Sequence, residues 1–430
     1  MPESPISSLF ICHWSLNDPL CQSQALAYMR PLAAAGHRYA LVTFEQPPHV
    51  MNAAEVDLAR GELRRQGIYW FPLAYHNRLA LASKAYDWLR GIALGLRVNR
   101  RHRPAIIHTR GTTSAGIAIV LQALTGMKFL YDADSSLADE YADTGYWTRD
   151  SAAFRVTAAC ERAARRRAKA VVVLSDRMRR RFVDEHRVAV PVEVIPCCVD
   201  TDRVTFDPDL RRARRADLGV SDGETLFVYV GKAGWRYQVD PMFAFLAAAR
   251  TALGPTKVLV LSGNPPDEFR DAARRHGFGE ADLHVRRSSP ADVPGWLSAA
   301  DAGLAFIRSL PCEEGSAPVK VAEYLSTGLP VVITPDIGDY SSLIDAERLG
   351  VVVRGSQPPD LAAAAGELRQ LFDEGVRLRE RCRSAAIARL SIDRVGAPRY
   401  AAVYRQLGCD HGIPGAASAA CAGLSTGAAH

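Results

Sequence analysis

The chain has no uninterrupted apolar run of about twenty residues, the length that a helix needs to cross a bilayer. Its first residues, MPESPISSLFICHW, lack a basic segment followed by a long apolar one, so we predict no signal peptide. The nine cysteines are scattered and include no C-x-x-C pair, which argues against the usual zinc patterns and for reduced thiols. These absences favour a cytoplasmic protein without a metal ion.

The chain also lacks a strong excess of either charge: 53 Lys and Arg stand against 47 Asp and Glu, a net charge of +6. The positive residues are nevertheless clustered, in the stretches 97–104, 162–169, 177–182 and 211–215. Such clusters are either solvated helix faces or surfaces for an anionic partner. Because no aromatic residues interleave with them, we expect no nucleic-acid partner. An anionic membrane stays open as a partner, which would place the protein on its inner face.

A chain of 430 residues is too long for one hydrophobic core and predicts two domains. Short apolar runs alternate with helix-forming segments, the pattern of a doubly wound parallel sheet. In the first half, the expected strands are 6–12, 39–45, 67–73, 104–111, 128–134 and 170–175. In the second half, they are 226–231, 257–263, 282–287, 301–307 and 329–334. The predicted fold class is α/β, with two tandem Rossmann-like domains facing a cleft.

The stretch VEVIPCCVDTDRV, residues 192–204, marks the junction between the two halves. We expect a first domain over 1–200 on the acceptor side and a second domain over 201–385 that binds the ligand. A helix over 386–408 follows, with a return to the first domain as one option. The tail over 409–430 is rich in Gly, Ala and Ser, which predicts disorder.

The stretch 316–339 predicts a loop, a short helix, a tight turn at Gly328 and a buried strand. Lys320 and Glu323 are three residues apart and share one face of that helix. The face begins at a helix N-terminus, which favours an anion such as phosphate. Spacing alone favours an ordinary surface ion pair, so the rest of the chain has to decide between the two interpretations.

Three motifs, in this order and at these separations, resemble the two-domain, retaining glycosyltransferases of the GT-B fold, family four. The first is the hinge VIPCCVDTDRV, the second is the strand and loop LFVYVGKAG, and the third is SAPVKVAEYLSTGLPVV. The resemblance covers nearly the whole chain up to about residue 407. It is closest to the bacterial polysaccharide-type members.

The resemblance implies how a nucleotide-sugar donor would be held. The Glu323 carboxylate would accept hydrogen bonds from the ribose hydroxyls, with Lys320 on the same face. The main-chain amides near Gly338 and Asp339 would lie close to the diphosphate. The donor would be a substrate, and no separate cofactor is expected.

The resemblance also implies which cations act in catalysis. Lys232 follows Gly231 at the position where the family places a basic residue that meets the leaving diphosphate. Arg236 is a second candidate, although the family's spacing between the two charges is not reproduced. Cations at the leaving oxygens would stabilise the charge that develops in the transition state.

The family commonly has two glutamates separated by seven residues, and the first contacts the donor sugar. Here Gly315 stands at the position of that first glutamate. Two alternatives remain open: Glu314 takes over the contact, or Ser316 and the backbone hold the sugar.

In the first domain, His108 and Arg110 occupy the place of a family His-x-His, whose second histidine faces the donor sugar. A lone histidine at a strand end is otherwise a structural residue.

Asp139 and Glu140 lie in an acidic segment that the resemblance assigns to acceptor binding. The nearby Asp132 and Asp134 form a D-x-D sequence, which holds a metal in another glycosyltransferase fold. The tandem open sheets argue against that fold, so we expect no metal here.

The predicted function is a hexosyltransferase that moves a sugar from a nucleotide-diphosphate sugar to a glycan or lipid-linked acceptor, with retention, in polysaccharide or glycoconjugate synthesis. A nucleotide-sugar epimerase or hydrolase on the same architecture is one alternative. A non-catalytic nucleotide-sugar-binding protein is another, because Gly315 replaces a ligand-binding glutamate.

Overall fold

The computed structural model describes residues 5–76 and 80–409, and the side chains of 80–82 are not described. It contains two wholly parallel sheets flanked by helices, which confirms the predicted fold class. The predicted disordered tail lies outside the described residues except for Cys409. No helix among the described residues is both long and apolar enough to cross a bilayer.

The first sheet has seven strands in the order β3-β2-β1-β4-β5-β6-β7. Its strands are β1 (Ser8–Cys12), β2 (Tyr39–Glu45), β3 (Ile68–Ala74), β4 (Ile106–Arg110), β5 (Lys128–Ala133), β6 (Ala170–Val173) and β7 (Val192–Val194). The central strands are buried along their whole length, because helices cover both faces of the sheet. Continuous apolar runs are the sequence signature of such strands.

The helices of this domain divide between the two faces of the sheet. They are α1 (Pro19–Cys21), the π-helical turn η1 (Gln22–Leu26), α2 (Ala27–Ala34), α3 (Ala53–Arg65), α4 (Ala80–His102), α5 (Thr112–Thr125), α6 (Leu137–Asp143), α7 (Ala152–Arg167), α8 (Asp176–Arg180) and η2 (Arg181–Glu185). Side chains from α2 and α3 form the core on one face, and side chains from α4, α5 and α7 form it on the other.

The second sheet has six strands in the order β10-β9-β8-β11-β12-β13. Its strands are β8 (Thr225–Val230), β9 (Thr256–Leu261), β10 (Leu283–Arg286), β11 (Ala302–Ala305), β12 (Val331–Ile333) and β13 (Gly350–Val352). The three-residue strand β13 was not among the strands expected from the sequence.

The second domain contains most of the remaining helices. They are α9 (Pro208–Asp217), α10 (Val239–Leu253), α11 (Asp267–Arg275), α12 (Val293–Ala299), the 3-10 turn η3 (Pro311–Gly315), α13 (Val319–Ser326), α14 (Tyr340–Ala346), α15 (Pro358–Phe372) and α16 (Val376–Leu390). Asp207 caps α9, since its side chain accepts hydrogen bonds from the first free amides, and Pro208 opens the helix.

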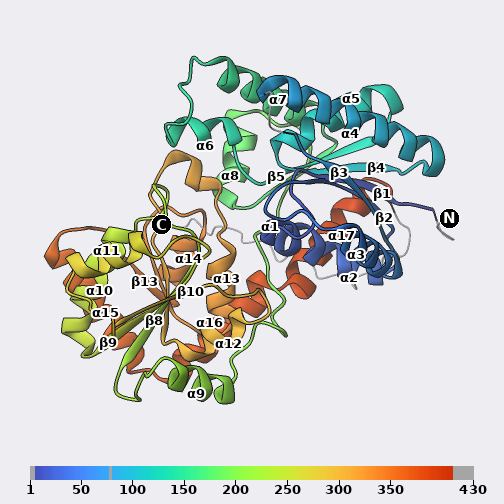
Figure 1. Ribbon diagram of the computed structural model, residues 1–430. Coiled ribbons are helices and arrows are strands. Elements are labelled where there is room, and N and C mark those ends of the chain that lie inside the picture. The colour runs from blue at the N-terminus through green and yellow to red at the C-terminus, as the bar shows by residue number, and fades with distance from the viewer. Residues whose placement is uncertain (1–4, 77–79, 410–430) are drawn as a thin grey trace, which may run out of the picture.

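The end of the chain returns to the first domain. After α16, the turn η4 (Ile392–Gly396) leads into α17 (Ala397–Gln406). Figure 1 shows α17, in red, beside the blue helices of the first domain, where Tyr400 and Tyr404 join the core that α2 and α3 form.

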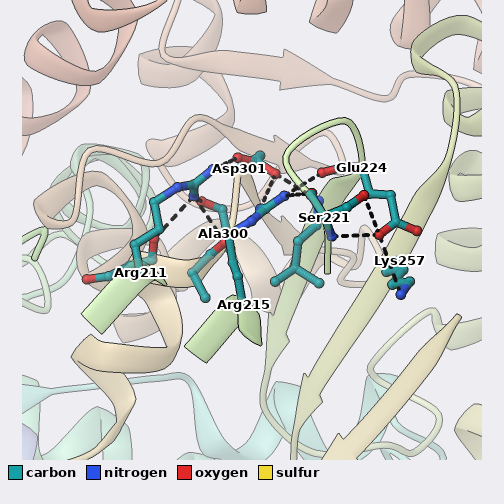
Figure 2. A network of polar contacts seen from close by, with 10 residues as sticks. Arg211, Arg215, Ser221, Glu224, Lys257, Ala300 and Asp301 are labelled. Carbon is teal, nitrogen blue, oxygen red and sulfur yellow. Dashed lines mark hydrogen bonds and ion pairs between the residues drawn. The ribbon is translucent and has the colours of Figure 1, made fainter. Parts of the chain in front are cut away.

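A polar network fastens α9 to the amino-terminal edge of the second sheet (Figure 2). Arg211 Nη2 and Arg215 Nη1 donate to the Asp301 carboxylate at 2.7 and 3.1 Å. That carboxylate also accepts from the backbone N–H of Leu226 at 2.8 Å, at the start of β8. The opposite edge, where the strands end, is therefore free to face the first domain.

Candidate functional site

The carboxyl ends of the two sheets meet across η3, the turn that follows β11. Ser175 Oγ, just after β6, donates to the carbonyl of Glu314 at 2.7 Å. The backbone N–H of Cys312 donates to Asp143 Oδ2 of α6 at 3.2 Å. Ligands of open parallel sheets bind at this edge, so the candidate site is built from the loops around η3 and α13.

Helix α13 begins at this edge and carries Lys320 and Glu323. Pro318 precedes its first turn, and Gly328, with a φ of 77°, ends it in the left-handed conformation that glycine adopts without strain. The other side of α13 is apolar and packs into the core of the second domain.

Lys320 is 9% exposed, and its Nζ has no hydrogen-bond partner among the described residues. The ammonium lies 4.3 Å from the ring centre of Tyr229 and 4.8 Å from that of Tyr237. Burial, together with the charge of Arg236, lowers the pKa of Lys320 to about 7. The two tyrosine rings replace only part of the hydration that the ammonium loses on burial. The ammonium can therefore still bind an anion.

Glu323 lies one turn further along α13 and is partly buried. Burial raises the pKa of Glu323, while Arg203 of the hinge and Lys320 oppose that rise. No partner hydrogen-bonds its carboxylate among the described residues, so it is available as an acceptor for ligand hydroxyls. Arg203 was not expected at this position.

Gly231 and Lys232 form the loop after β8. Gly231 has a φ of 148°, and a Cβ there would lie 2.8 Å from Lys320 Nζ, so glycine leaves room for the buried amine. Lys232 is exposed, and its carbonyl accepts a hydrogen bond from the Tyr229 hydroxyl at 2.6 Å. The structure therefore brings Gly231 to Lys320 and leaves the Lys232 side chain in solvent.

Arg236 connects the two domains. Its Nε lies 2.6 Å from Glu313 Oε1 in η3, and its Nη1 lies 3.1 Å from Glu140 Oε1 in α6. Burial opposes the charge, but the Glu313 and Glu140 carboxylates raise the pKa of Arg236 above its usual value. Since two carboxylates already neutralise Arg236, a free cation for a leaving diphosphate is not present there in this conformation.

The loop that lacks the family's first glutamate packs directly on the first domain. A Cβ at Gly315 would lie 2.9 Å from Met178 Sδ of α8. The side chain of Glu314 is exposed, whereas Glu313 is 1% exposed and paired with Arg236. Glu313, not Glu314, is therefore the carboxylate that points inward. Ser316 closes the turn by donating its N–H to the carbonyl of Glu313 at 2.9 Å.

The Gly338 amide and the Asp339 carboxylate are both engaged within the protein. The Gly338 N–H donates to the carbonyl of Glu313 at 2.9 Å, and a Cβ at Gly338 would lie 1.9 Å from the carbonyl of Ser316. Asp339 Oδ2 accepts from the N–H of Asp176 at 2.5 Å, which caps α8 from the other domain. The Gly338 N–H is therefore not free for a diphosphate, and the Asp339 side chain holds an interdomain contact.

His108 and Arg110 lie in a buried cluster beneath α17. His108 Nδ1 is 2.7 Å from the Tyr404 hydroxyl, and burial lowers the pKa of His108. Arg110 Nη1 donates to Asp132 Oδ2 at 2.8 Å, and Tyr400 donates to the same oxygen at 2.6 Å. With exposures of 2% each, His108 and Arg110 fasten the end of the chain, which is the structural role left open for His108.

The acidic candidates of α6 are paired with arginines. Asp139 accepts from Arg149 and Arg181, each at 2.8 Å, and Glu140 is engaged by Arg236. Burial raises the pKa of Asp134 to about 7, which separates it from the ionised Asp132. Within residues 5–76 and 80–409, no group of three or more His, Cys, Asp or Glu side chains is placed to hold a metal ion.

Family models match both halves of the chain. The model described as "Glycosyl transferase 4-like domain" matches residues 21–198, and the model described as "Glycosyl transferases group 1" matches residues 224–370. The unmatched segment between them contains the end of the hinge and α9.

Two curated relatives match about half of this chain. A GDP-mannose-dependent alpha-(1-6)-phosphatidylinositol monomannoside mannosyltransferase of Mycolicibacterium smegmatis is 26% identical over 209 residues, which are 47% of this chain and 53% of the relative. A D-inositol 3-phosphate glycosyltransferase of Nocardia farcinica is 25% identical over 222 residues, 46% of each chain. The chain thus spans about half the length of the curated relatives it matches.

Solved structures match nearly the whole chain. HepE of Anabaena, crystallised with UDP, superposes with a TM-score of 0.70 at 13% identity, covering 93% of this chain and 100% of HepE. WaaG, a glycosyltransferase involved in lipopolysaccharide biosynthesis, superposes with a TM-score of 0.66 at 19% identity, covering 95% of this chain and 100% of WaaG. At such identities, the likeness shows a shared fold.

Proposed function

This chain belongs to the GT-B glycosyltransferases that combine a glycosyl transferase 4-like domain with a group 1 domain, and from this premise we propose that it is a hexosyltransferase. It transfers a sugar from a nucleotide-diphosphate sugar to a glycan or lipid-linked acceptor, with retention at the sugar carbon. The products serve polysaccharide or glycoconjugate synthesis.

The observation that carries this proposal is the unpaired ammonium of Lys320. A buried amine without a hydrogen-bond partner in the described residues destabilises the folded protein, and a purely structural role would not offset that cost. A diphosphate beside Gly231 would supply the missing acceptors, and the start of α13 would add its N–H groups. Glu323, one turn away, would then accept from the ribose hydroxyls.

The same groups serve the chemistry. Breaking the bond between the sugar and the diphosphate develops negative charge on the leaving oxygens. Lys320 meets that charge from within the site, and Lys232 reaches it from the solvent side of the loop. The departing phosphate helps to deprotonate the acceptor hydroxyl, so no protein nucleophile is needed.

The donor class follows from the diphosphate site rather than from one relative. The M. smegmatis relative is named as GDP-mannose-dependent, and HepE is described as bound to UDP or UDP-glucose. We therefore propose that the donor is a nucleoside diphosphate hexose, whose base the following experiment identifies. A thermal-shift panel of such sugars tests it: a ligand at about a hundred times its Kd stabilises the fold by about 2.7 kcal/mol.

Glu323→Ala is the decisive variant for this site. Loss of the ribose contacts should weaken binding of the responding nucleotide sugar about tenfold or more, because a hydrogen bond to a charged group contributes about 1.5–3 kcal/mol. Isothermal titration calorimetry measures the change, with Glu367→Ala on the exposed face of α15 as the matched control. Unchanged affinity in Glu323→Ala would contradict the assignment of the donor site.

Turnover of the nucleotide sugar, measured with and without acceptor glycans, then distinguishes transfer from hydrolysis or epimerisation.

The basic stretch 177–182 supports a peripheral contact with anionic lipid on the inner face of the membrane. Arg180 of α8 is exposed, and Arg179 is half-buried beside Asp176. Reversing both charges should abolish flotation with phosphatidylglycerol vesicles and leave nucleotide binding intact. Flotation that persists would contradict the membrane contact.

A further inference from the structure

A hollow on the surface of the first domain lies between α7 and the loop that follows η2. It has a volume of about 400 Å³ and is open to solvent. One wall is the carboxy-terminal half of α7, and the other is the segment Glu185–Val190. None of the residues assigned above to the donor or to the acceptor lines it.

Four arginines line this hollow: Arg162, Arg165 and Arg166 from α7, and Arg187 from the loop. Their guanidinium groups form no ion pair and no hydrogen bond within the part of the chain that the structure describes. The lining includes one carboxylate, Glu185, which instead lies 3.5 Å from Arg181 Nε. The hollow therefore carries a concentrated positive charge: four arginines line it against one carboxylate.

Arg165 shows that the arginines of the hollow do not all lie on a solvent-exposed helix face. Its guanidinium is largely desolvated and lies 5.3 Å from the ring centre of Phe182. The His186 ring packs on the same phenylalanine at 5.6 Å, and burial, with the neighbouring arginines, lowers the pKa of His186. His186 is then neutral at pH 7 and can donate one ring N–H.

The ordinary explanation for arginines at the end of α7 is the helix dipole, which favours cations at a carboxyl terminus. That explanation accounts for charge in the last turn of α7. It does not account for Arg187, which comes from the opposing loop and holds a left-handed φ of 53°, a conformation that non-glycine residues rarely adopt. Charges that converge from two elements on one hollow are the arrangement expected of an anion site.

We propose that this hollow binds a phosphate group, held between the arginines of α7 and Arg187. Guanidinium groups match the geometry of phosphate oxygens, which accept paired hydrogen bonds. The volume admits a phosphate together with the group that carries it. The phosphate comes either free in solution, as inorganic phosphate or pyrophosphate, or on the headgroup of a lipid. This proposal does not depend on the donor site.

The test compares two double charge reversals in the full chain. Arg162→Glu with Arg166→Glu changes exposed arginines of the hollow, and Arg97→Glu with Arg100→Glu makes the same charge change on the exposed face of α4. Calorimetry with pyrophosphate, in the presence of excess UDP to fill the cleft, is the first arm. Flotation with vesicles of phosphatidic acid or of phosphatidylcholine, with and without competing inorganic phosphate, is the second arm. Circular dichroism verifies that each variant folds.

The proposal predicts binding in at least one arm that weakens about tenfold or more in the hollow variant and changes less than about twofold in the α4 variant. Binding of pyrophosphate identifies a soluble ligand, and binding confined to phosphatidic acid vesicles identifies a lipid headgroup. Equal losses in the two variants, or no binding in either arm, would overturn it. Either result leaves the donor site untouched, because Glu323→Ala tests that site separately.

Discussion

Lys320 combines deep burial with an amine that has no hydrogen-bond acceptor among the described residues. Most buried lysines avoid this state by pairing with a carboxylate or by reaching the surface. Here two tyrosine faces hold the ammonium 4.3 and 4.8 Å from their centres, and Gly231 leaves the space above it open. The side chain is therefore costly in the free protein and useful only when a ligand is present.

Lys320→Met should separate these two effects. Methionine fills similar space without a charge, so the free protein should gain about 1–3 kcal/mol in its free energy of unfolding at pH 7. Affinity for the nucleotide sugar should fall about tenfold or more, because the charge-assisted contacts to phosphate are lost. Urea denaturation and calorimetry measure the two quantities. A variant that loses stability as well as affinity would indicate that Lys320 is a structural residue.

The pKa of about 7 also predicts how donor binding depends on pH. An anion stabilises the ammonium form, so binding raises the pKa of Lys320 and takes up a proton above pH 7. The Kd should stay constant below pH 7 and increase up to about tenfold per pH unit above it. Calorimetry with a nucleotide sugar, whose charge is constant in this range, measures the slope. The same slope in Lys320→Met would assign it to another group.

Sequence spacing predicts that Lys320 and Glu323 share one face of a helix. It does not predict which residues from other segments surround them. Lys320 and Glu323 share a face because three residues make nearly one turn of α13. Tyr229 and Tyr237 lie about ninety residues earlier in the sequence, so the lysine's surroundings depend on the tertiary fold. Glu313 and Glu314 are adjacent, and only the contact with Arg236 decides which carboxylate turns inward.

At the scale of elements, α9 is held to the sheet by charge more than by apolar area. Arg215 is 6% exposed and donates to Asp301 Oδ2 and to the carbonyls of Ser221 and Glu224 (Figure 2). Arg215→Ala would leave these acceptors unsatisfied and should lower the free energy of unfolding by about 2–4 kcal/mol. Nucleotide affinity should not change, since the network lies at the edge opposite the cleft.

Arg212→Ala is the control for this change, because Arg212 lies on the same helix and pairs only with the exposed Asp209. Its effect on urea denaturation should be below about 0.5 kcal/mol. Equal effects of the two substitutions would show that the buried network contributes nothing particular.

Long elements were predictable because each carries its own pattern. Continuous apolar runs identify the central strands of both sheets, and alternation with helices implies parallel pairing. Strand β13 was not predicted, because three residues are too few to show a pattern. Its pairing with β12 defines it instead. The return of α17 was only an option, since nothing local indicates which core a terminal helix covers.

At the scale of the whole molecule, the last helix completes the first domain. The Tyr400 hydroxyl donates to Asp132 Oδ2 at 2.6 Å and accepts from Arg110 at 3.3 Å, so residues far apart in the sequence share one buried network. Tyr400→Phe should lower the free energy of unfolding by about 1–3 kcal/mol, because it leaves a buried carboxylate short of a donor. Thermal denaturation measures the loss, with the exposed Tyr86→Phe as control. A null effect would mean that the helix is held by its apolar contacts alone.

This network also gives two of the catalytic candidates buried partners that the sequence did not indicate. His108 and Arg110 stand at the end of β4, where the family has functional residues, but their tyrosine partners, Tyr404 and Tyr400, lie almost three hundred residues later. A motif read in one segment cannot reveal that a distant helix will cover it. The contacts of Gly338 with Glu313 and of Asp339 with Asp176 could not be predicted for the same reason, because their partners belong to other segments.

The position of α17 has a consequence for protein synthesis. While the second domain is being translated, the face of the first sheet that α17 covers has no partner, and its apolar side chains stay accessible. At roughly 5–20 residues per second, the roughly 200 residues that separate the end of the first domain from α17 keep it incomplete for about 10–40 seconds. The newly made first domain therefore presents an apolar surface to chaperones until α17 has left the ribosome.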